Sequence, residues 1–224
     1  MKICIFGADG RTGVEVVKQA LKDKHEVVAF VYNPEARNYL PEGIRVIEGN
    51  ILSQTDVAKA VSECDAAISV VGHIKGSNPR MQTKGIKNII EAMRTKKIKR
   101  IVSLTGTGVR IEGDMPSVFD KIGNWIIKII DKERIMDGIQ HAEVLKNSNL
   151  DWTVLRVLKL SDANFTEDEN ENFDPSLVST ESYTLTENGP AEAFTSRKKV
   201  AKIMVDLVSS DEYFQKMPVV SNLS

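Results

Sequence analysis

Short runs of β-branched and other apolar residues alternate with segments of helical periodicity from the start of the chain. Six such runs predict strands, over Lys2 to Phe6, Val27 to Val31, Arg45 to Glu48, Ala66 to Val71, Arg100 to Leu104 and Trp152 to Arg156. The runs are apolar at successive positions instead of alternating with polar residues. That pattern is typical of parallel strands that are buried on both faces.

Amphipathic segments separate these runs. Between Lys84 and Lys97, apolar residues recur at i, i+3, i+4 and i+7, and basic residues fill the opposite face. Repeated strand, helix, strand order predicts right-handed βαβ units and an α/β fold with a doubly wound parallel sheet, the Rossmann fold. We expect one domain over 1–224, because the length suits a single core. The ligand crevice of such a sheet lies at the carboxyl ends of its strands.

Two segments depart from this rhythm. The chain from Ser161 to Ser182 includes the acidic run 168–172 and has neither helical nor strand periodicity. We expect a loop-rich insertion over 161–192, on the substrate side of the domain. The segment Ser117 to Ile130 is apolar over more than one packing stripe. It either lies deep in the core or meets another subunit, which would make the protein a homodimer through this helix.

Charge and composition narrow the classes of partner. With 30 Lys and Arg against 31 Asp and Glu, the formal net charge is -1, so no general field attracts nucleic acid or an anionic membrane surface. No apolar stretch approaches the roughly 20 residues that span a bilayer, and the run after Met1 is too short for a signal peptide. Cys4 and Cys64 have no metal-binding spacing and suit buried thiols. We expect a cytoplasmic protein without a metal that binds a small molecule.

Three glycines, Gly7, Gly10 and Gly13, lie between the first strand and the helical run Val14 to Leu21. The first permits a tight exit from the strand, the second allows a pyrophosphate to approach, and the third lets the helix pack on the sheet. The N-terminus of the helix then offers free N–H groups to phosphate. The context predicts that the turn, with Asp9, Arg11 and Thr12, holds the pyrophosphate of NAD or NADP.

The end of the second strand is where a carboxylate would bind the free ribose hydroxyl of NAD. Here Tyr32 and Asn33 follow the strand, and no carboxylate stands there. Arg37 and Arg11 could instead reach the 2′-phosphate of NADP from opposite sides. We therefore expect NADP, with NAD left open. The alternative is that Arg37 is a solvated loop residue.

Motifs after successive strands resemble one family. They are GADGRTG, VYNPEAR, EGNIL, VVG and SLTGTG, followed by HAEVLKNSNLDWTVLR leading into the sixth strand. Together they resemble the atypical short-chain dehydrogenase/reductases of the NAD(P)H-binding, NmrA-like group, near the flavin reductase/biliverdin-IXβ reductase branch. The resemblance spans nearly the whole chain.

The resemblance implies roles for three further groups of residues. It implies an adenine border at Asn50, Ile51 and Leu52, a place beneath the nicotinamide ribose for Val71, Gly72 and His73, and a place beside the nicotinamide for Ser103, Thr105 and Gly106. The chain also departs from the family. Tyr32 stands where many relatives have an arginine for the 2′-phosphate, and Val157-Leu158-Lys159 replaces the Pro-Pro-His of the biliverdin-reductase branch. The substrate is therefore not inherited from the resemblance.

The Tyr-x-x-x-Lys pair of ordinary short-chain dehydrogenases is missing. The residues four positions after the four tyrosines are Ala36, Gly43, Glu187 and Met217. Without a tyrosine of lowered pKa, the reaction takes its proton from solvent, or the chain binds the cofactor without turning it over.

Two side chains are the candidates for catalysis. Thr105 could donate a hydrogen bond to a substrate carbonyl, and Lys159 could neutralise a developing anion. The alternatives are a strand-end hydroxyl bonded to backbone and a surface lysine. Of the three histidines, His73 lies on the ligand side, whereas His25 lies on the far side and His141 within a helix.

Two functions remain. The first is an NAD(P)H-dependent oxidoreductase that passes hydride to a small conjugated acceptor such as a flavin or quinone. The second is a non-catalytic, NAD(P)-binding redox sensor of the NmrA-like kind, which the apolar segment Ser117 to Ile130 favours. Sugar-nucleotide epimerisation is disfavoured, because it needs the same missing Tyr-Lys pair.

Overall fold

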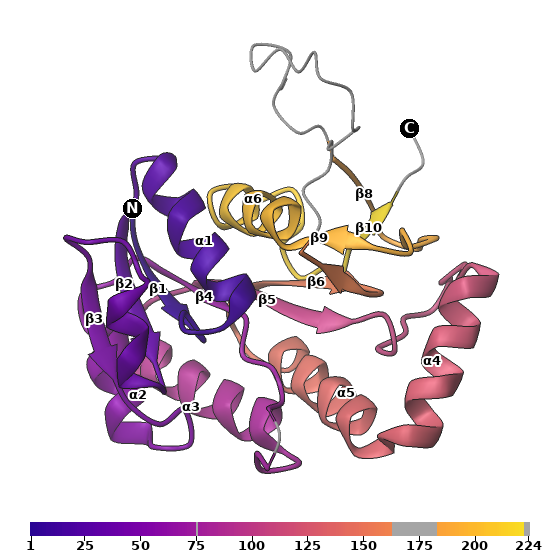
Figure 1. The fold of residues 1–224 in the computed structure, drawn as a ribbon, viewed down its shortest axis with the longest axis horizontal. Helices are drawn as coiled ribbons and strands as arrows, with labels where there is room; N and C mark the ends of the chain where they lie inside the picture. Colours follow the sequence, from indigo (N-terminus) through magenta and orange to yellow (C-terminus); the bar gives the residue numbers. More distant parts are fainter. Residues whose placement is uncertain (75, 163–182, 222–224) are drawn as a thin grey trace.

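An eight-stranded sheet runs through the molecule between two layers of helices (Figure 1). The computed structural model describes residues 1–74, 76–162 and 183–221. The strands of the sheet are β1 Lys2–Phe6, β2 Glu26–Val31, β3 Arg45–Glu48, β4 Ala66–Ser69, β5 Arg100–Gly106, β6 Asp151–Val157, β8 Thr184–Thr186 and β10 Val219–Ser221. Their order is β3-β2-β1-β4-β5-β6-β10-β8. The pairs are parallel up to β10, and β8 is antiparallel to β10 at the edge.

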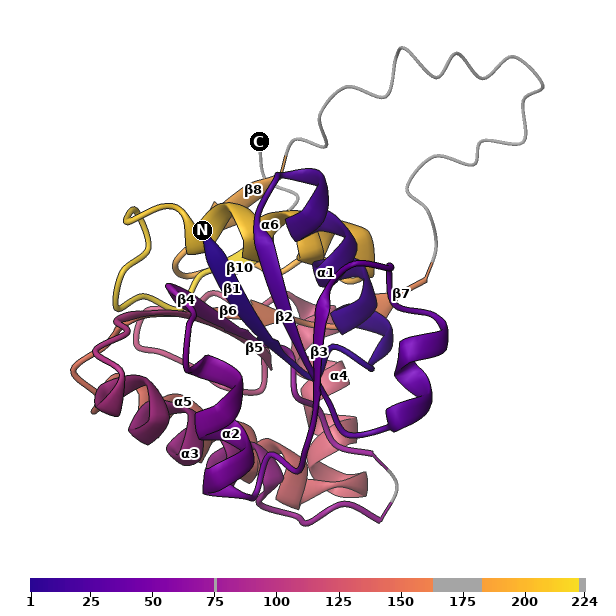
Figure 2. The same ribbon diagram turned by 90° about the vertical axis from the view of Figure 1, so that its left-hand side faces the viewer.

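The helices cover both faces of the sheet, as Figures 1 and 2 show. They are α1 Arg11–Lys22, α2 Gln54–Val61, α3 Met81–Thr95, α4 Val118–Ile130, α5 Lys132–Lys146 and α6 Arg197–Val208, with the 3-10 helix η1 Pro34–Asn38 after β2. Helices α1 and α6 pack on one face, and α2, α3 and α5 pack on the other. A second, two-stranded sheet pairs β7 Leu160–Ser161 with β9 Thr195–Ser196, directly before α6.

Strand β1 shows why the strands are apolar throughout. Ile3 and Ile5 point into the core beneath α1 and α6, whereas Cys4 and Phe6 point into the core beneath α2, α3 and α5. All four side chains are fully buried. Because successive side chains point to opposite faces, a strand between two helical layers must be apolar at every position. The doubly wound fold expected from the sequence is confirmed.

The six expected strands are all present, with ends that shift by one or two residues. Strands β8 and β10 were missed. Each has three residues, and neither shows a periodicity that distinguishes it from a loop. They form because one edge of β6 is free to pair. Strand β10 pairs with that edge through Val219 and Arg156, and β8 then pairs with β10. The local pattern could not predict that pairing.

The insertion expected over 161–192 falls largely outside the described residues, since 163–182 and the acidic run within it are not described. In its described part, β8 joins the edge of the main sheet. The chain after Tyr183 is therefore part of the sheet architecture. The assignment of the rest to the substrate side stays a prediction.

Helix α4 lies at one end of the molecule (Figure 1) and exposes its apolar side chains. Phe119 is 75% exposed and Trp125 is 64% exposed. The exposed set also includes Val118, Ile122, Ile126 and Ile129. The interpretation of this segment as a core helix is therefore wrong for these side chains, and the alternative of an interface stays a prediction.

Both cysteines are buried free thiols, as expected. In residues 1–74, 76–162 and 183–221, no helix is long and apolar enough to cross a membrane. The same residues contain no group of three or more His, Cys, Asp or Glu side chains arranged to hold a metal ion.

Candidate functional site

The turn after β1 has a shape that only glycine permits at two positions. Gly7 has φ +80, and a Cβ on it would lie 3.2 Å from Val71 N. A Cβ on Gly13 would lie 2.0 Å from Gly7 O, which no side chain could accommodate. The Gly10 N–H closes the turn by donating to Gly7 O over 3.0 Å. These contacts agree with a tight strand exit and a close approach of helix to sheet.

Helix α1 begins at this turn without a side-chain cap. Gly10 is its N-cap residue and makes no side-chain hydrogen bond to the first turn, which also carries no acidic residue. The first N–H groups of an α-helix have no partner within the helix and carry the positive end of its dipole. The N-terminus of α1 therefore suits an anionic group such as a pyrophosphate, and the chain fits a dinucleotide here.

A pocket of about 530 Å³ opens beside the turn, where the strand order reverses between β1 and β4. That reversal is where doubly wound sheets bind their ligands. The pocket brings together many of the residues expected at the cofactor. Those in its wall are Gly7, Asp9, Gly10, Tyr32, Asn50, Ile51, Leu52, Val71 and Gly72, joined by Phe30, Val70, Ile74, Gly76, Ser77, Asn78 and Met81. Thr12 and Gly13 are buried in the first turn of α1.

The loop after β3 forms one wall of the pocket and is held in place by polar contacts. Asn50 Oδ1 accepts the Leu52 N–H over 2.9 Å, and the Asn50 N–H donates to Asp56 Oδ2 over 3.1 Å. Asn88 of α3 donates to Ile51 O over 3.0 Å. Because Asn50 Oδ1 accepts from the backbone, the Asn50 amide nitrogen is the group that can donate toward a ligand.

The end of β2 carries a carboxylate that comes from the glycine turn. Asp9 Oδ2 accepts the Tyr32 N–H over 3.0 Å and the Asn33 N–H over 2.9 Å. Asn33 also caps η1, because its Oδ1 accepts the Glu35 N–H. Tyr32 lines the pocket and is 65% exposed.

The two arginines expected at a 2′-phosphate are engaged elsewhere. Arg37 Nε pairs with Glu48 Oε1 at 2.8 Å, at the end of β3. Arg11 pairs with Asp162 at 2.9 Å, and Asp162 also contacts Arg197 of α6 at 2.5 Å. Arg11 lines a neighbouring cavity of about 430 Å³ instead of the pocket beside the turn. Asp9 lines both.

A buried polar cluster lies beyond the carboxyl end of β4. Asp137 of α5 accepts the N–H groups of Gln82 and Thr83, and the Thr83 hydroxyl contacts the same carboxylate at 2.5 Å. His73 Nε2 lies 2.9 Å from Asp137 Oδ2. His73, which was expected beneath the nicotinamide ribose, thus lies beside this carboxylate, although its Nε2 makes no hydrogen bond among the described residues. Sequence reasoning missed Asp137, because its partners are more than fifty positions away.

His141 lies one turn after Asp137 on α5, and its Nε2 is 2.8 Å from Ser103 Oγ on β5. Burial lowers the pKa of His141 to about 4, so the ring is neutral at neutral pH. His141, which the sequence places within a helix, contacts a residue expected beside the nicotinamide. The spacing of Asp137 and His141, four residues apart on one helix face, was the available signal.

The two candidates for catalysis lie in different surroundings. Thr105 is buried on β5, and a Cβ on Gly138 of α5 would lie 3.2 Å from its Oγ1. Lys159 is exposed after β6, with its ammonium 5.0 Å from the centre of the Phe194 ring. Their catalytic roles stay predictions.

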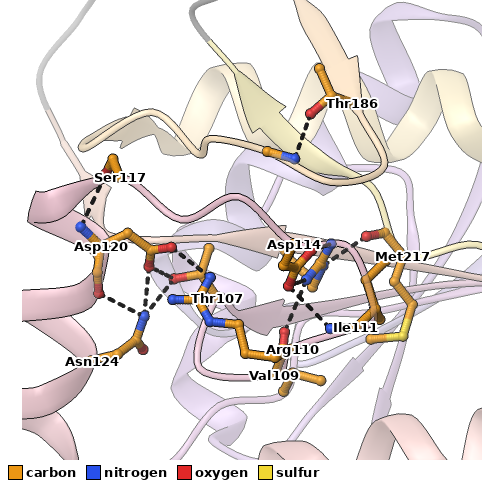
Figure 3. A network of polar contacts seen from close by, with 12 residues as sticks. Thr107, Val109, Arg110, Ile111, Asp114, Ser117, Asp120, Asn124, Thr186 and Met217 are labelled. Carbon is orange, nitrogen blue, oxygen red and sulfur yellow. Dashed lines mark hydrogen bonds and ion pairs between the residues drawn. The ribbon is translucent and has the colours of Figure 1, made fainter.

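The segment after β5 is held by a network of buried charges (Figure 3). Asp120 accepts from the Thr107 hydroxyl over 2.6 Å and pairs with Arg110 at 2.6 Å, and the Asn124 amide donates to the same carboxylate. Beside them, the fully buried Arg156 contacts Asp114 at 2.6 Å. It also donates to three backbone carbonyls, those of Met217, Val109 and Glu187. This network fixes the chain at the carboxyl ends of β5 and β6.

Comparisons with known proteins agree with this geometry. The fold is similar to a short-chain dehydrogenase/reductase of Veillonella parvula in complex with NADP, with a TM-score of 0.74, 20% identity, and coverage of 99% of this chain and 94% of that one. It is also similar to ChuY, an anaerobilin reductase of Escherichia coli O157:H7, with a TM-score of 0.75, 19% identity, and coverage of 100% and 99%. At these identities the likeness shows the fold alone.

The relatives found by sequence match this chain over only part of their own length. The photosystem II assembly factor Ycf39 of Synechocystis is 25% identical over 99% of this chain and 63% of its own length. The matches cover 48% and 63% of the length of the two curated relatives, from Bacillus subtilis and Synechocystis. A model of the NAD(P)H-binding family matches residues 7–211, which include the glycine turn, the pocket and the buried polar cluster. The chain therefore belongs to the NAD(P)H-binding family, and it fits the atypical short-chain dehydrogenase/reductases of the NmrA-like group.

Proposed function

We propose that the protein is an NAD(P)H-dependent reductase that passes hydride to a small conjugated acceptor, such as a flavin or a quinone. The observation that carries this proposal is the pocket that joins the uncapped N-terminus of α1 to the carboxyl end of β4. Bound NAD(P)H supplies the hydride, and the accompanying proton comes from solvent. The residues of the chain bind the dinucleotide and orient it toward the acceptor.

The buried groups near β4 and β5 support an acceptor that needs no protein acid. His141 is neutral because burial holds its pKa at about 4. Its contact with Ser103 fixes the Ser103 hydroxyl and the end of β5. The sequence has no Tyr-x-x-x-Lys pair. Flavins and quinones, once reduced, take their protons from water, so a pocket without a donor can still reduce them.

Two similar proteins give further support. ChuY is described as an anaerobilin reductase, and the Veillonella protein was solved with NADP. For this chain, NADP was favoured from Arg37 and Arg11. Both arginines are in ion pairs with acidic side chains, so the contacts of Asp9 also bear on the choice of dinucleotide.

The test is oxidation of NADH and NADPH by a panel of flavins, quinones and dyes, followed by absorbance of the reduced nicotinamide. We expect at least one acceptor to be reduced. Thr105→Ala and Lys159→Ala should slow the reaction, and Lys146→Ala, an exposed lysine at the end of α5, is the control. Cofactor binding without oxidation of any acceptor would contradict the proposal.

A second function is favoured by the exposed face of α4. In this alternative, the protein binds dinucleotide as a redox sensor and docks a protein partner through Phe119, Trp125 and their apolar neighbours. Ycf39, a relative, is described as an assembly factor. Dinucleotide binding with no turnover, together with a partner lost on Trp125→Glu, would favour this alternative over the reductase.

A further inference from the structure

No acidic residue directly follows β2 in the chain, but the carboxylate of Asp9 lies at this strand end. Its Oδ2 is 3.0 Å from the Tyr32 N and 2.9 Å from the Asn33 N. In dinucleotide-binding sheets, an acidic side chain at this strand end binds the ribose hydroxyls of NAD, and it is ordinarily found about 20 residues after the glycine turn. Here the turn itself supplies the acid, 23 and 24 positions before its two partners.

The same carboxylate faces the cofactor pocket. Asp9 and Tyr32 line it with Gly7 and Gly10, so the acid faces the same pocket as the glycine turn. Asp9 is half-buried. Both of its side-chain hydrogen bonds use Oδ2, and among the described residues Oδ1 has no hydrogen-bond partner. It is available to accept from a ribose hydroxyl.

Three cations, Arg11, Arg197 and Lys198, line the neighbouring cavity with Asp9. Arg11 and Arg197 share Asp162, and Arg37 pairs with Glu48. The phenol of Tyr39 donates a hydrogen bond to Asp9 O, and its pKa responds to the negative charge of Asp9. Burial raises the pKa of Tyr39, and the negative charges of Asp9 and Glu35 raise it further. A 2′-phosphate at this strand end would meet a fixed like charge.

We infer that Asp9 is the residue that sets cofactor preference, and that it selects NAD over NADP by accepting a ribose hydroxyl and repelling the 2′-phosphate. The inference deepens the proposed function and rests on it for dinucleotide binding. It reverses the preference expected from Arg37 and Arg11. The sequence expectation looked for the acid only after β2, whereas the fold brings the carboxylate of Asp9 there from the preceding turn.

The experiment measures the dissociation constants of NADH and NADPH by fluorescence or calorimetry, without any acceptor. We expect the wild-type protein to bind NADH at least about tenfold more tightly than NADPH. Asp9→Asn keeps an oxygen for the two N–H groups and removes the charge, so it should reduce the ratio by about tenfold, mainly by tightening NADPH. Asp23→Asn, an exposed acid at the other end of α1, is the control and should leave the ratio unchanged.

Tighter binding of NADPH by the wild-type protein would overturn the inference, and so would an unchanged ratio in Asp9→Asn. The outcomes separate this inference from the reductase proposal. NADH preference with no acceptor reduced would leave the role of Asp9 standing and contradict the reductase. If neither dinucleotide binds, both fail.

Discussion

The turn after β1 and the segment after β5 both leave a strand on the crevice side and lead into a helix, but they are held differently. The turn is fixed by its backbone, through the Gly10 N–H to Gly7 O bond and the space left at Gly13. The segment after β5 is fixed by buried charges, such as Asp114 against Arg156, which are 42 positions apart. The first arrangement is encoded locally, and the second exists only in the folded chain.

The difference has an energetic side. Backbone hydrogen bonds and glycine sterics involve no buried charge, whereas Arg156 and Asp114 must be fully paired to offset the loss of their hydration. A partly broken network leaves a charge buried without compensation. The region after β5 should therefore be the more sensitive of the two to single substitutions of polar side chains.

The largest effect is expected from Arg156→Met. It removes every donor to Asp114 from this side chain and leaves three carbonyls short of a partner. We expect a loss of about 3–5 kcal/mol in the free energy of unfolding, measured by urea titration. Arg45→Met, which breaks an exposed pair with Glu63, should cost far less than Arg156→Met. Equal losses in the two variants would contradict the comparison.

The second largest effect on the free energy of unfolding is expected from the protonation of His141 as pH falls. Its pKa is about 4 in the folded protein against an ordinary value of 6.5 for the unfolded chain, so the unfolded chain binds the proton first as pH falls. Stability from this group is full above pH 6.5 and is lost toward pH 4, by up to about 3 kcal/mol. Unfolding of wild-type and His141→Gln proteins across this window measures the difference. A wild-type slope identical to that of His141→Gln would exclude this role.

A substitution on helix α4 should change the free energy of unfolding much less than one at Arg156. Trp125→Glu changes an exposed side chain, so the free energy of unfolding should stay within about 0.5 kcal/mol of wild type. If a second copy covers this face, as one of the alternatives from the sequence proposes, the molar mass in solution should fall from dimer to monomer. Light scattering on the wild type and the variant measures this change. A monomeric wild-type protein would contradict the homodimer and leave the face to another partner.

The smallest effect is expected at Arg37. It is half-exposed and paired with Glu48, so Arg37→Ala should change the NADPH dissociation constant by less than about threefold. Calorimetric titration beside the wild type measures it. A much larger loss would restore Arg37 as a ligand of the 2′-phosphate.

Sequence reasoning succeeded where one segment carries its own signal. The alternation of apolar strands and amphipathic helices predicted six strands and the doubly wound sheet, and the glycine spacing predicted the turn. Strand β10 was missed because three residues carry no period, and it forms only against the edge of β6. The sequence pattern also could not predict that the apolar side chains of α4 are exposed, because a wide apolar surface suits a buried core helix and an interface equally.

The site shows the same division. The family resemblance implied that Asn50 and Val71 lie at the cofactor, and both line the pocket. The contact of Asp9 with the end of β2 and the contact of His141 with Ser103 depend on tertiary structure. Each joins residues on different elements, and no local spacing indicates which element will supply the partner. A rule that looks for an acid only at its usual position in the chain therefore misses one that the fold brings from another turn.

A Gly10→Ala substitution tests whether the turn after β1 holds a dinucleotide. Gly10 has ordinary extended backbone angles, and a Cβ there would lie 3.3 Å from Gly7 O, so alanine should fold at a modest cost, but its methyl group would stand where the pyrophosphate approaches. Calorimetric titration should show at least about tenfold weaker binding of NADH, with an unfolding free energy within about 1 kcal/mol of wild type. NADH binding at wild-type affinity by a folded Gly10→Ala protein would contradict the account.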